Sequence, residues 1–167
     1  MATSLKNLSD TAIQPIPNAT GYKFGILVAE WNPEVTESMG KAAKETLLVH
    51  GVKPEDILYK YVPGSYELSL GAQYMAEYTD VDAIIVLGCV IQGETRHFDY
   101  VCKAVTEGTN EVSLKYNIPV GFGVLTTENQ QQALDRAGGK HGNKGDEAAG
   151  AAIKMVALKH EINQKND

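Results

Sequence analysis

The sequence predicts an α/β fold, a three-layer αβα sandwich around a four-stranded parallel sheet. Two observations predict it. Four short apolar runs alternate with longer segments of helical periodicity along the 167 residues, and this order requires crossover connections between parallel strands. Two of the runs, residues 23–29 (KFGILVA) and 83–91 (AIIVLGCVI), are nearly continuous. Such runs are typical of strands that are covered on both faces.

The individual elements follow from local signals. After the strand at 23–29, Pro33 suits the first turn of a helix and Gly51 can end it, which predicts a helix over residues 33–50. The other predicted strands are residues 57–62, 83–91 and 119–125. The other predicted helices are residues 64–78, 97–116, 128–137 and 146–160, with a glycine-rich link at 138–145. The alanine-rich last helix implies close helix packing.

The domain prediction is one domain over residues 21–162, followed by a tail at 163–167. Residues 1–20 are polar, with Pro15 and Pro17 and without sustained periodicity. They are expected to be either a loose arm or an extended segment that adds a strand to a neighbouring subunit's sheet.

Composition limits the classes of function. The chain is 43% hydrophobic and 22% charged, with a net charge of −6. An acidic surface repels phosphate backbones, so nucleic acid is not an expected partner. Cys89 and Cys102 lie in apolar segments without metal-ligand spacing, which favours reduced core thiols and no metal site. No secretory signal is visible, and the longest apolar run is too short to cross a bilayer, so a cytoplasmic protein without membrane contact is expected.

Ligands of such sheets bind beyond the carboxyl ends of the strands. The residues at the carboxyl ends of the strands at 23–29, 57–62 and 83–91, or directly after them, are 30–32 (EWN), 63–67 (PGSYE) and 89–97 (CVIQGETRH). Together they supply an aromatic face, carboxylates, a hydroxyl and an imidazole.

Five motifs resemble those of the lumazine synthase family and follow the family's order. They are VPGSYEL (62–68), GCVIQGETRHFDYV (88–101), FGVLTTEN (122–129), QALDRAGGKHGNKG (132–145) and the EAA that follows. The resemblance covers roughly residues 22–160. It implies a flavodoxin-like fold and a transferase that condenses 5-amino-6-(D-ribitylamino)uracil with 3,4-dihydroxy-2-butanone 4-phosphate. The product is 6,7-dimethyl-8-ribityllumazine, in the penultimate step of riboflavin biosynthesis, and the family needs no cofactor.

The resemblance also assigns roles to residues. His97 becomes the acid/base group, whereas the residue alone would suggest a helix-start histidine with a local partner. Glu94 and Thr95 become phosphate-binding residues in a turn that could equally be a helix cap. The residues expected to hold the ribitylaminouracil are Trp31, Ser65, Tyr66, Glu67, Cys89, Val90, Ile91 and Phe122. Cys89 is expected to be a wall of the pocket rather than a nucleophile.

Arg136 is expected to bind the phosphate of a neighbouring subunit's site. A helix over 128–137 would run back across the sheet and carry Arg136 about 14 Å from the carboxyl edge. The resemblance implies the same arrangement, because active sites in the family lie between adjacent subunits of a pentamer, with Phe122 also supplied by a neighbour. The residue alone would suggest a surface arginine near a helix C-terminus.

Several alternatives remain at this point. The chain could be a non-catalytic flavin-binding or shell-forming relative, or a flavodoxin-like redox protein. Pentamers could stay separate or build an icosahedral 60-mer. Trp31 stands where many relatives carry phenylalanine, which leaves the affinity for riboflavin open, and Gln92 stands where many carry a basic residue. The segment 138–145 is not a P-loop, because it lacks the glycine-lysine-hydroxyl end.

Overall fold

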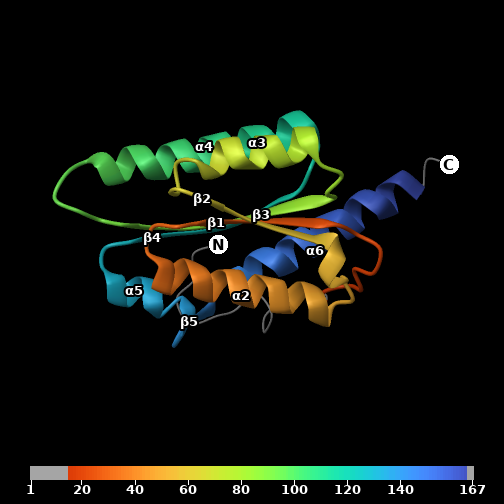
Figure 1. Cartoon of the computed structure of the whole chain (residues 1–167), viewed down its shortest axis with the longest axis horizontal. Helices are drawn as coiled ribbons and strands as arrows, with labels where there is room; N and C mark the ends of the chain where they lie inside the picture. Colours follow the sequence, from red (N-terminus) through yellow and green to blue (C-terminus); the bar gives the residue numbers. More distant parts are fainter. Residues whose placement is uncertain (1–14, 165–167) are drawn as a thin grey trace.

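The computed structural model describes residues 15–164 and confirms the predicted parallel sheet. The strands are β1 (Phe24–Ala29), β2 (Ile57–Val62), β3 (Ala83–Ile91) and β4 (Val120–Thr127), in the order β2-β1-β3-β4. Figure 1 shows α3 (Leu68–Tyr78) and α4 (His97–Tyr116) on one face of the sheet, and α2 (Pro33–Val49), α5 (Gln130–Leu134) and α6 (Lys144–Gln164) on the other. A short 3₁₀ helix, Pro54–Asp56, precedes β2. Because β1 connects to β2 on one side and pairs with β3 on the other, the strand order reverses between β1 and β3.

The core lies on both faces of the two central strands. Side chains alternate along each strand, so Ile26 and Ile85 pack toward α2 and α6, whereas Leu27 and Val86 pack toward α3 and α4. All of β1 is buried, and β3 is buried from Ala83 to Cys89. This explains why these two runs are nearly continuous in the sequence.

Small residues bring α6 close to its neighbours. A Cβ atom on Gly145 would lie 2.0 Å from the Met39 carbonyl oxygen in α2. A Cβ atom on Gly121, in β4, would lie 2.4 Å from the Ala148 carbonyl oxygen in α6. The close packing expected from the alanine-rich helix is therefore confirmed.

Two of the predicted helices are shorter in the structure. The helix predicted from residue 64 begins at Leu68, because residues 64–67 form tight turns in which Glu67 N donates to Gly64 O (3.2 Å). The helix predicted over 128–137 is only Gln130–Leu134. β4 pairs with β3 as far as Thr127, and the Asn129 side chain then caps the helix by accepting from Gln132 N.

The glycine-rich link is structured. It forms a two-stranded antiparallel hairpin of β5 (Ala137–Gly139) and β6 (Gly142–Asn143), where a plain link was expected. Gly138 and Gly142 have φ values of 106° and 75°, which favour glycine. α6 begins directly after the hairpin at Lys144 rather than at residue 146.

The predicted termini also need correction. Ala19 is fully buried and donates from its backbone N to His50 O (2.7 Å), and Ile16 packs against the core. Residues 15–20 therefore belong to the domain rather than to a loose arm. At the other end α6 extends to Gln164, into the predicted tail. The rest of the predicted arm, residues 1–14, and of the tail, residues 165–167, lie outside the described residues.

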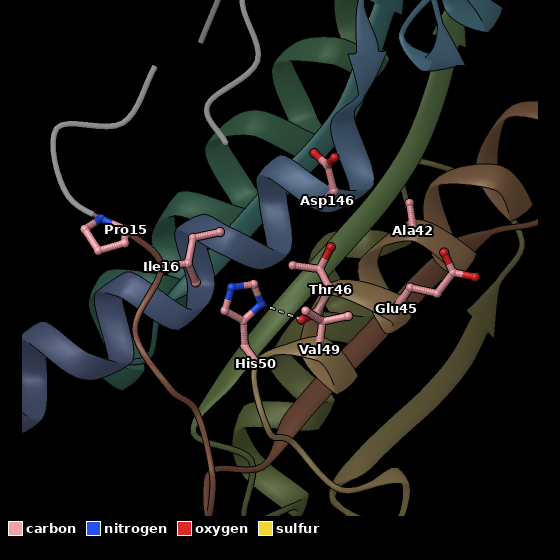
Figure 2. Close-up of a pocket in the computed structure, with 8 residues that line it drawn as sticks. All are labelled: Pro15, Ile16, Ala42, Glu45, Thr46, Val49, His50 and Asp146. Atoms are coloured by element: carbon pink, nitrogen blue, oxygen red, sulfur yellow. Dashed lines mark hydrogen bonds between the residues drawn. The ribbon is translucent and has the colours of Figure 1, made fainter. Parts of the chain in front are cut away.

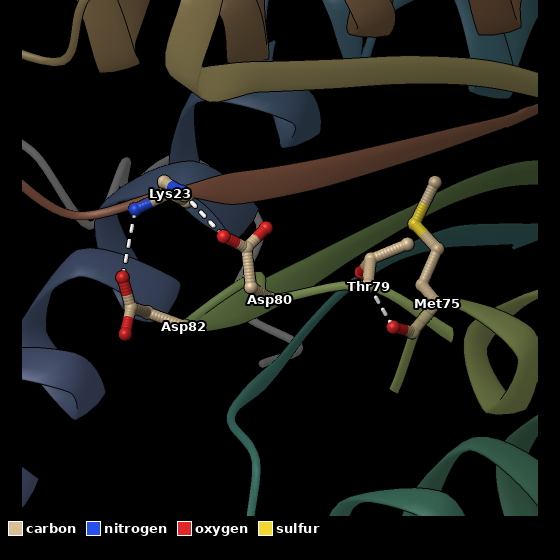
Figure 3. Close-up of polar contacts among 5 residues, drawn as sticks. All are labelled: Lys23, Met75, Thr79, Asp80 and Asp82. Carbon is tan, nitrogen blue, oxygen red and sulfur yellow. Dashed lines mark hydrogen bonds and ion pairs between the residues drawn. The ribbon is translucent and has the colours of Figure 1, made fainter. Parts of the chain in front are cut away.

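Polar contacts fix the amino edge of the sheet, opposite the edge where ligands are expected. Lys23, just before β1, donates from its backbone N to Asp82 (2.7 Å), and its ammonium group pairs with Asp80 (Figure 3). The Thr79 hydroxyl ends α3 by donating to Met75 O (2.6 Å). The two Lys23 contacts tie the start of β1 to the α3–β3 connection.

Within residues 15–164, no helix is long and apolar enough to cross a membrane. The same part of the chain holds no group of three or more histidine, cysteine or acidic side chains placed to bind a metal ion.

Candidate active site

A cavity of about 800 Å³ opens at the carboxyl edge of the sheet, where the strand order reverses. Its lining comes from the segments after β1 and β2, from the end of β3 and from the start of α4. The lining residues are Trp31, Asn32, Gly64, Ser65, Tyr66, Glu67, Cys89, Val90, Ile91, His97 and Val101. Eight of the twelve predicted site residues are therefore brought together, and the volume suits a small organic ligand.

Aromatic side chains stand open at this cavity. Trp31 is 72% exposed and Tyr66 is 62% exposed. Gly64 lies between Trp31 and Glu67, since a Cβ atom there would be 3.1 Å from Trp31 Cδ1 and 3.2 Å from Glu67 Oε2. A lone tryptophan is often part of a core, but an exposed indole at a cavity is suited to stacking on a flat ring.

The polar groups of the cavity include one buried hydroxyl. Ser65 is 5% exposed, and its Oγ has no hydrogen-bond partner within residues 15–164. Buried hydroxyl groups are nearly always hydrogen-bonded. The Ser65 hydroxyl and the nearby Glu67 carboxylate can therefore offer hydrogen bonds to a polar ligand.

His97 is the first residue of α4 and is exposed at the mouth of the cavity. Its backbone N donates to Thr95 Oγ1 (3.4 Å), so the Thr95 hydroxyl keeps its own proton for another acceptor. The Gln92 side chain braces the same turn by donating to Gly93 O (2.7 Å). A helix start with free hydroxyl and amide donors is a favourable environment for an anion.

Cys89 forms part of the cavity wall. It is buried, and burial raises the pKa of its thiol to about 11. A thiol with this pKa is almost entirely protonated at neutral pH, so Cys89 is unsuited to nucleophilic attack.

Four predicted site residues do not line this cavity in the described chain: Glu94, Thr95, Phe122 and Arg136. Glu94 and Thr95 lie in the turn between the cavity-lining residues Ile91 and His97. Phe122 is five residues before the end of β4, about 17 Å along the strand, and lines a separate hollow of about 250 Å³ beside α4.

Arg136 lies between α5 and β5, in the helix layer opposite α4. The prediction that a long helix carries Arg136 away from the carboxyl edge was wrong, because α5 has five residues and does not run back across the sheet. Instead, Arg136 donates from Nη1 to Gln132 O (2.9 Å), and its own carbonyl accepts from Lys144 N (2.9 Å). Lys140 pairs with Asp135 (2.9 Å) and Lys144 with Glu147 (2.6 Å).

Asn32, Gly64 and Val101 also line the cavity, although the sequence assigned them no individual role. Asn32 and Gly64 belong to the segments that follow the first two strands, so their position was a usable signal. Val101 lies one helical turn after His97, on the same side of α4.

A second cavity, of about 480 Å³, lies away from these residues (Figure 2). It is lined by Pro15, Ile16, Ala42, Glu45, Thr46, Val49, His50 and Asp146. The His50 ring Nδ1 lies 2.8 Å from Thr46 O, which directs the imidazole along α2. No predicted site residue lines this cavity.

The fold and the first cavity define a class: flavodoxin-like α/β proteins with a small-molecule site where the strand order reverses. The sequence profile of 6,7-dimethyl-8-ribityllumazine synthase matches residues 21–160. A protein of that name from Cytophaga hutchinsonii is 59% identical over 157 residues, covering 94% of this chain and 98% of the relative. Proteins of the same name from Parabacteroides distasonis (56% over 156 residues; 93% and 98%) and Porphyromonas gingivalis (50% over 158 residues; 95% and 98%) are also similar.

The chain belongs to the 6,7-dimethyl-8-ribityllumazine synthase family. The resemblance noted from the five sequence motifs is confirmed.

Proposed function

We propose that this chain condenses 5-amino-6-(D-ribitylamino)uracil with 3,4-dihydroxy-2-butanone 4-phosphate to form 6,7-dimethyl-8-ribityllumazine, phosphate and water. The observation that carries the proposal is the cavity of about 800 Å³, which gathers eight of the residues that the family resemblance assigns to the site. Family membership is the argument for this reaction, and the cavity is the proposed site of the reaction.

The pyrimidine substrate is proposed to lie against Trp31, with its ring stacked on the exposed indole. The Cys89–Ile91 segment forms the opposite wall. Glu67 accepts hydrogen bonds from ribityl hydroxyl groups, and the Ser65 hydroxyl, which lacks a partner within residues 15–164, pairs with a polar group of this substrate. A ligand bond there would remove the cost of burying an unpaired hydroxyl.

The phosphate of the second substrate is proposed to bind at the turn before α4. The helix start carries partial positive charge, and the Thr95 hydroxyl and the Glu94 amide can donate to phosphate oxygens. His97 lies beside this turn and the cavity, so it can move protons during imine formation and phosphate elimination. It needs no metal for this role.

Phe122 and Arg136 are proposed to complete the site of a neighbouring subunit. Both stand outside the cavity of their own chain, Phe122 because of its place in mid-strand and Arg136 because of its place in the opposite layer. Phe122 is 43% exposed and so is open to a neighbour. An arginine fork suits a phosphate bidentately. The proposed assembly is a homopentamer, either alone or as part of an icosahedral 60-mer.

The rate enhancement is proposed to come from three effects in order of size. Holding both substrates in register removes orientational entropy and contributes most. Donors around the departing phosphate stabilise charge. Proton transfer by His97 contributes about a hundredfold.

The direct test is to incubate the purified protein with both substrates and to record the fluorescence of the lumazine product. Product should form with both substrates at a rate above the enzyme-free mixture, and not when either is omitted. A rate equal to that of the enzyme-free mixture would reject the enzyme and favour a non-catalytic flavin-binding or shell-forming relative.

Subunit sharing needs its own test. Mixed oligomers of His97→Ala and Arg136→Ala chains contain some interfaces with both native side chains, so activity should exceed that of either variant alone. Mixing His97→Ala with Thr95→Ala is the matched control, because both changes fall on the same side of the interface and no complete site can form. Failure of the first pair to complement in verified mixed oligomers would reject sharing.

A further inference from the structure

Strands β1 and β3 separate at the cavity, and one side chain bridges the gap. Their paired residues end at Val28 and Leu87. The next residue beyond β1, Glu30, donates from its backbone N to Val62 O in β2 (2.9 Å), so the chain turns away from β3. Asn32 then reaches back, and its Nδ2 donates to Cys89 O (3.0 Å).

Asn32 adopts an unusual backbone conformation to do this. Its φ and ψ are 59° and 55°, in the left-handed region, where asparagine is among the few residues other than glycine that are tolerated. Its carbonyl accepts from Val35 N (2.9 Å) and Thr36 N (3.1 Å), which starts α2. The backbone of Asn32 is thus fixed by the helix while its side chain is fixed by β3.

The Asn32 side chain does not cap α2, which is the usual role of an asparagine at this position. An asparagine that precedes a helix commonly accepts a hydrogen bond from a backbone N–H of the first turn. Asn32 makes no such capping bond, although it is the residue before α2. Backbone strain together with an unused cap is typical of a residue held in place for a site.

We propose that Asn32 is a positioning residue for the pyrimidine substrate. Its hydrogen bond to Cys89 O fixes the spacing between the wall that carries Trp31 and the wall formed by the end of β3, and both walls line the cavity. A flat ring held between two walls depends on that spacing, whereas the phosphate turn before α4 does not. This inference rests on the proposed function and assigns Asn32 to one substrate of the two.

Two variants separate the hydrogen bond from the backbone conformation. Asn32→Gly keeps the left-handed backbone and removes the amide donor. Asn32→Asp keeps a residue tolerated in that region and places a carboxylate against the Cys89 carbonyl. Each should raise KM for 5-amino-6-(D-ribitylamino)uracil about tenfold, which corresponds to the loss of about one hydrogen bond. KM for 3,4-dihydroxy-2-butanone 4-phosphate should stay unchanged, and kcat should change less than KM for the pyrimidine.

Asn117→Gly is the matched control. Asn117 is the other non-glycine residue with positive φ among residues 15–164 (φ 50°), and it follows the last residue of α4, about 30 Å along the helix from His97. This variant should keep both KM values. Melting temperatures of all variants are measured alongside the kinetics.

The outcomes are distinct. A selective rise in KM for the pyrimidine supports the inference. Wild-type KM values in both Asn32 variants would overturn the inference. A rise in both KM values, accompanied by a fall in kcat and in the melting temperature, would also overturn it and would indicate a merely structural role. Absence of the reaction in the wild-type chain would defeat the proposed function and, with it, this inference.

Discussion

Gly64 lies directly against the indole of Trp31, because a Cβ atom at position 64 would come within 3.1 Å of Trp31 Cδ1. The same atom would lie 3.2 Å from Glu67 Oε2. The Gly64→Ala variant must therefore shift Trp31, Glu67 or both by a few tenths of an ångström. KM for the ribitylaminouracil should rise about fivefold, equivalent to ~1 kcal/mol, with kcat little changed. Steady-state kinetics with each substrate varied in turn would measure this.

Gly71→Ala controls for the added methyl group. Its Cβ atom would meet Val62 Cγ1 at 3.1 Å and Leu27 Cδ1 at 3.2 Å, so the crowding is similar but falls in the core behind the cavity. This variant should leave both KM values unchanged. An equal rise in KM in both variants would show that an added methyl group anywhere near the cavity has this effect, and that displacement of Trp31 or Glu67 is not its cause.

His97→Ala tests the proton-transfer role. The side chain is exposed at the start of α4, so its removal should leave the melting temperature nearly unchanged. The single-turnover rate should fall about a hundredfold, because general acid–base catalysis typically contributes that much or more. His97→Asn, which keeps a polar side chain but cannot shuttle protons at neutral pH, should behave like the alanine variant. Unchanged single-turnover rates would remove His97 from the mechanism, and complete inactivity with normal binding would contradict the ranking of effects.

The layers and the sheet could be predicted because burial leaves a direct mark on the sequence. β1 and β3 are covered on both faces and read as continuous apolar runs. The element boundaries that were predicted wrongly depend on tertiary contacts instead. β4 continues to Thr127 because Ile91 pairs with it, and the helix after it ends at Leu134 because the chain turns into the β5–β6 hairpin.

The cavity residues could be predicted for a topological reason. The carboxyl ends of parallel strands and the segments that follow them meet at one edge, so Trp31, Ser65 and Cys89 come together although they are far apart in the chain. Phe122 and Arg136 could not be placed by this rule. Phe122 lies in the middle of β4, and Arg136 lies between α5 and β5 in the layer opposite α4. The same rule placed Asn32 at this edge, but its role depends on a backbone conformation and on a hydrogen bond to a carbonyl, which a residue pattern does not predict.

Trp31 offers an optical test of the cavity, because it is the only tryptophan of the chain and is 72% exposed. Riboflavin resembles the lumazine product and should stack on the indole, so added riboflavin should quench the tryptophan emission saturably. N-acetyltryptophanamide at the same absorbance controls for optical filtering. Quenching that rises without saturation and matches this control would show that the flavin does not bind at Trp31.

Asp135 directly precedes Arg136, and its carboxylate contacts the β5–β6 hairpin that follows through Lys140. Its side chain, 12% exposed, pairs with Lys140 (2.9 Å) and accepts from Gln131 Nε2 (2.9 Å). Hydrogen bonds from Lys140 and then from Gln131 hold the pKa of Asp135 below its usual value.

The direction of the pH dependence follows from this shift. A group whose pKa is lower in the folded state stabilises the fold above its unfolded pKa, about 3.9 for aspartate, and loses that contribution as the pH falls through the folded value. Asp135→Asn should therefore melt at a lower temperature than the wild type at pH 7, and the difference should shrink below about pH 4. Asp80→Asn is the control, since Asp80 also pairs with a lysine, Lys23, and also has a lowered pKa, but its side chain is 77% exposed. Solvent screens such exposed pairs, so the loss at pH 7 should be smaller for Asp80→Asn. Equal losses in the two variants, or a difference for Asp135→Asn that does not shrink as the pH falls below 4, would show that the Asp135 contacts stabilise the hairpin through packing rather than through charge.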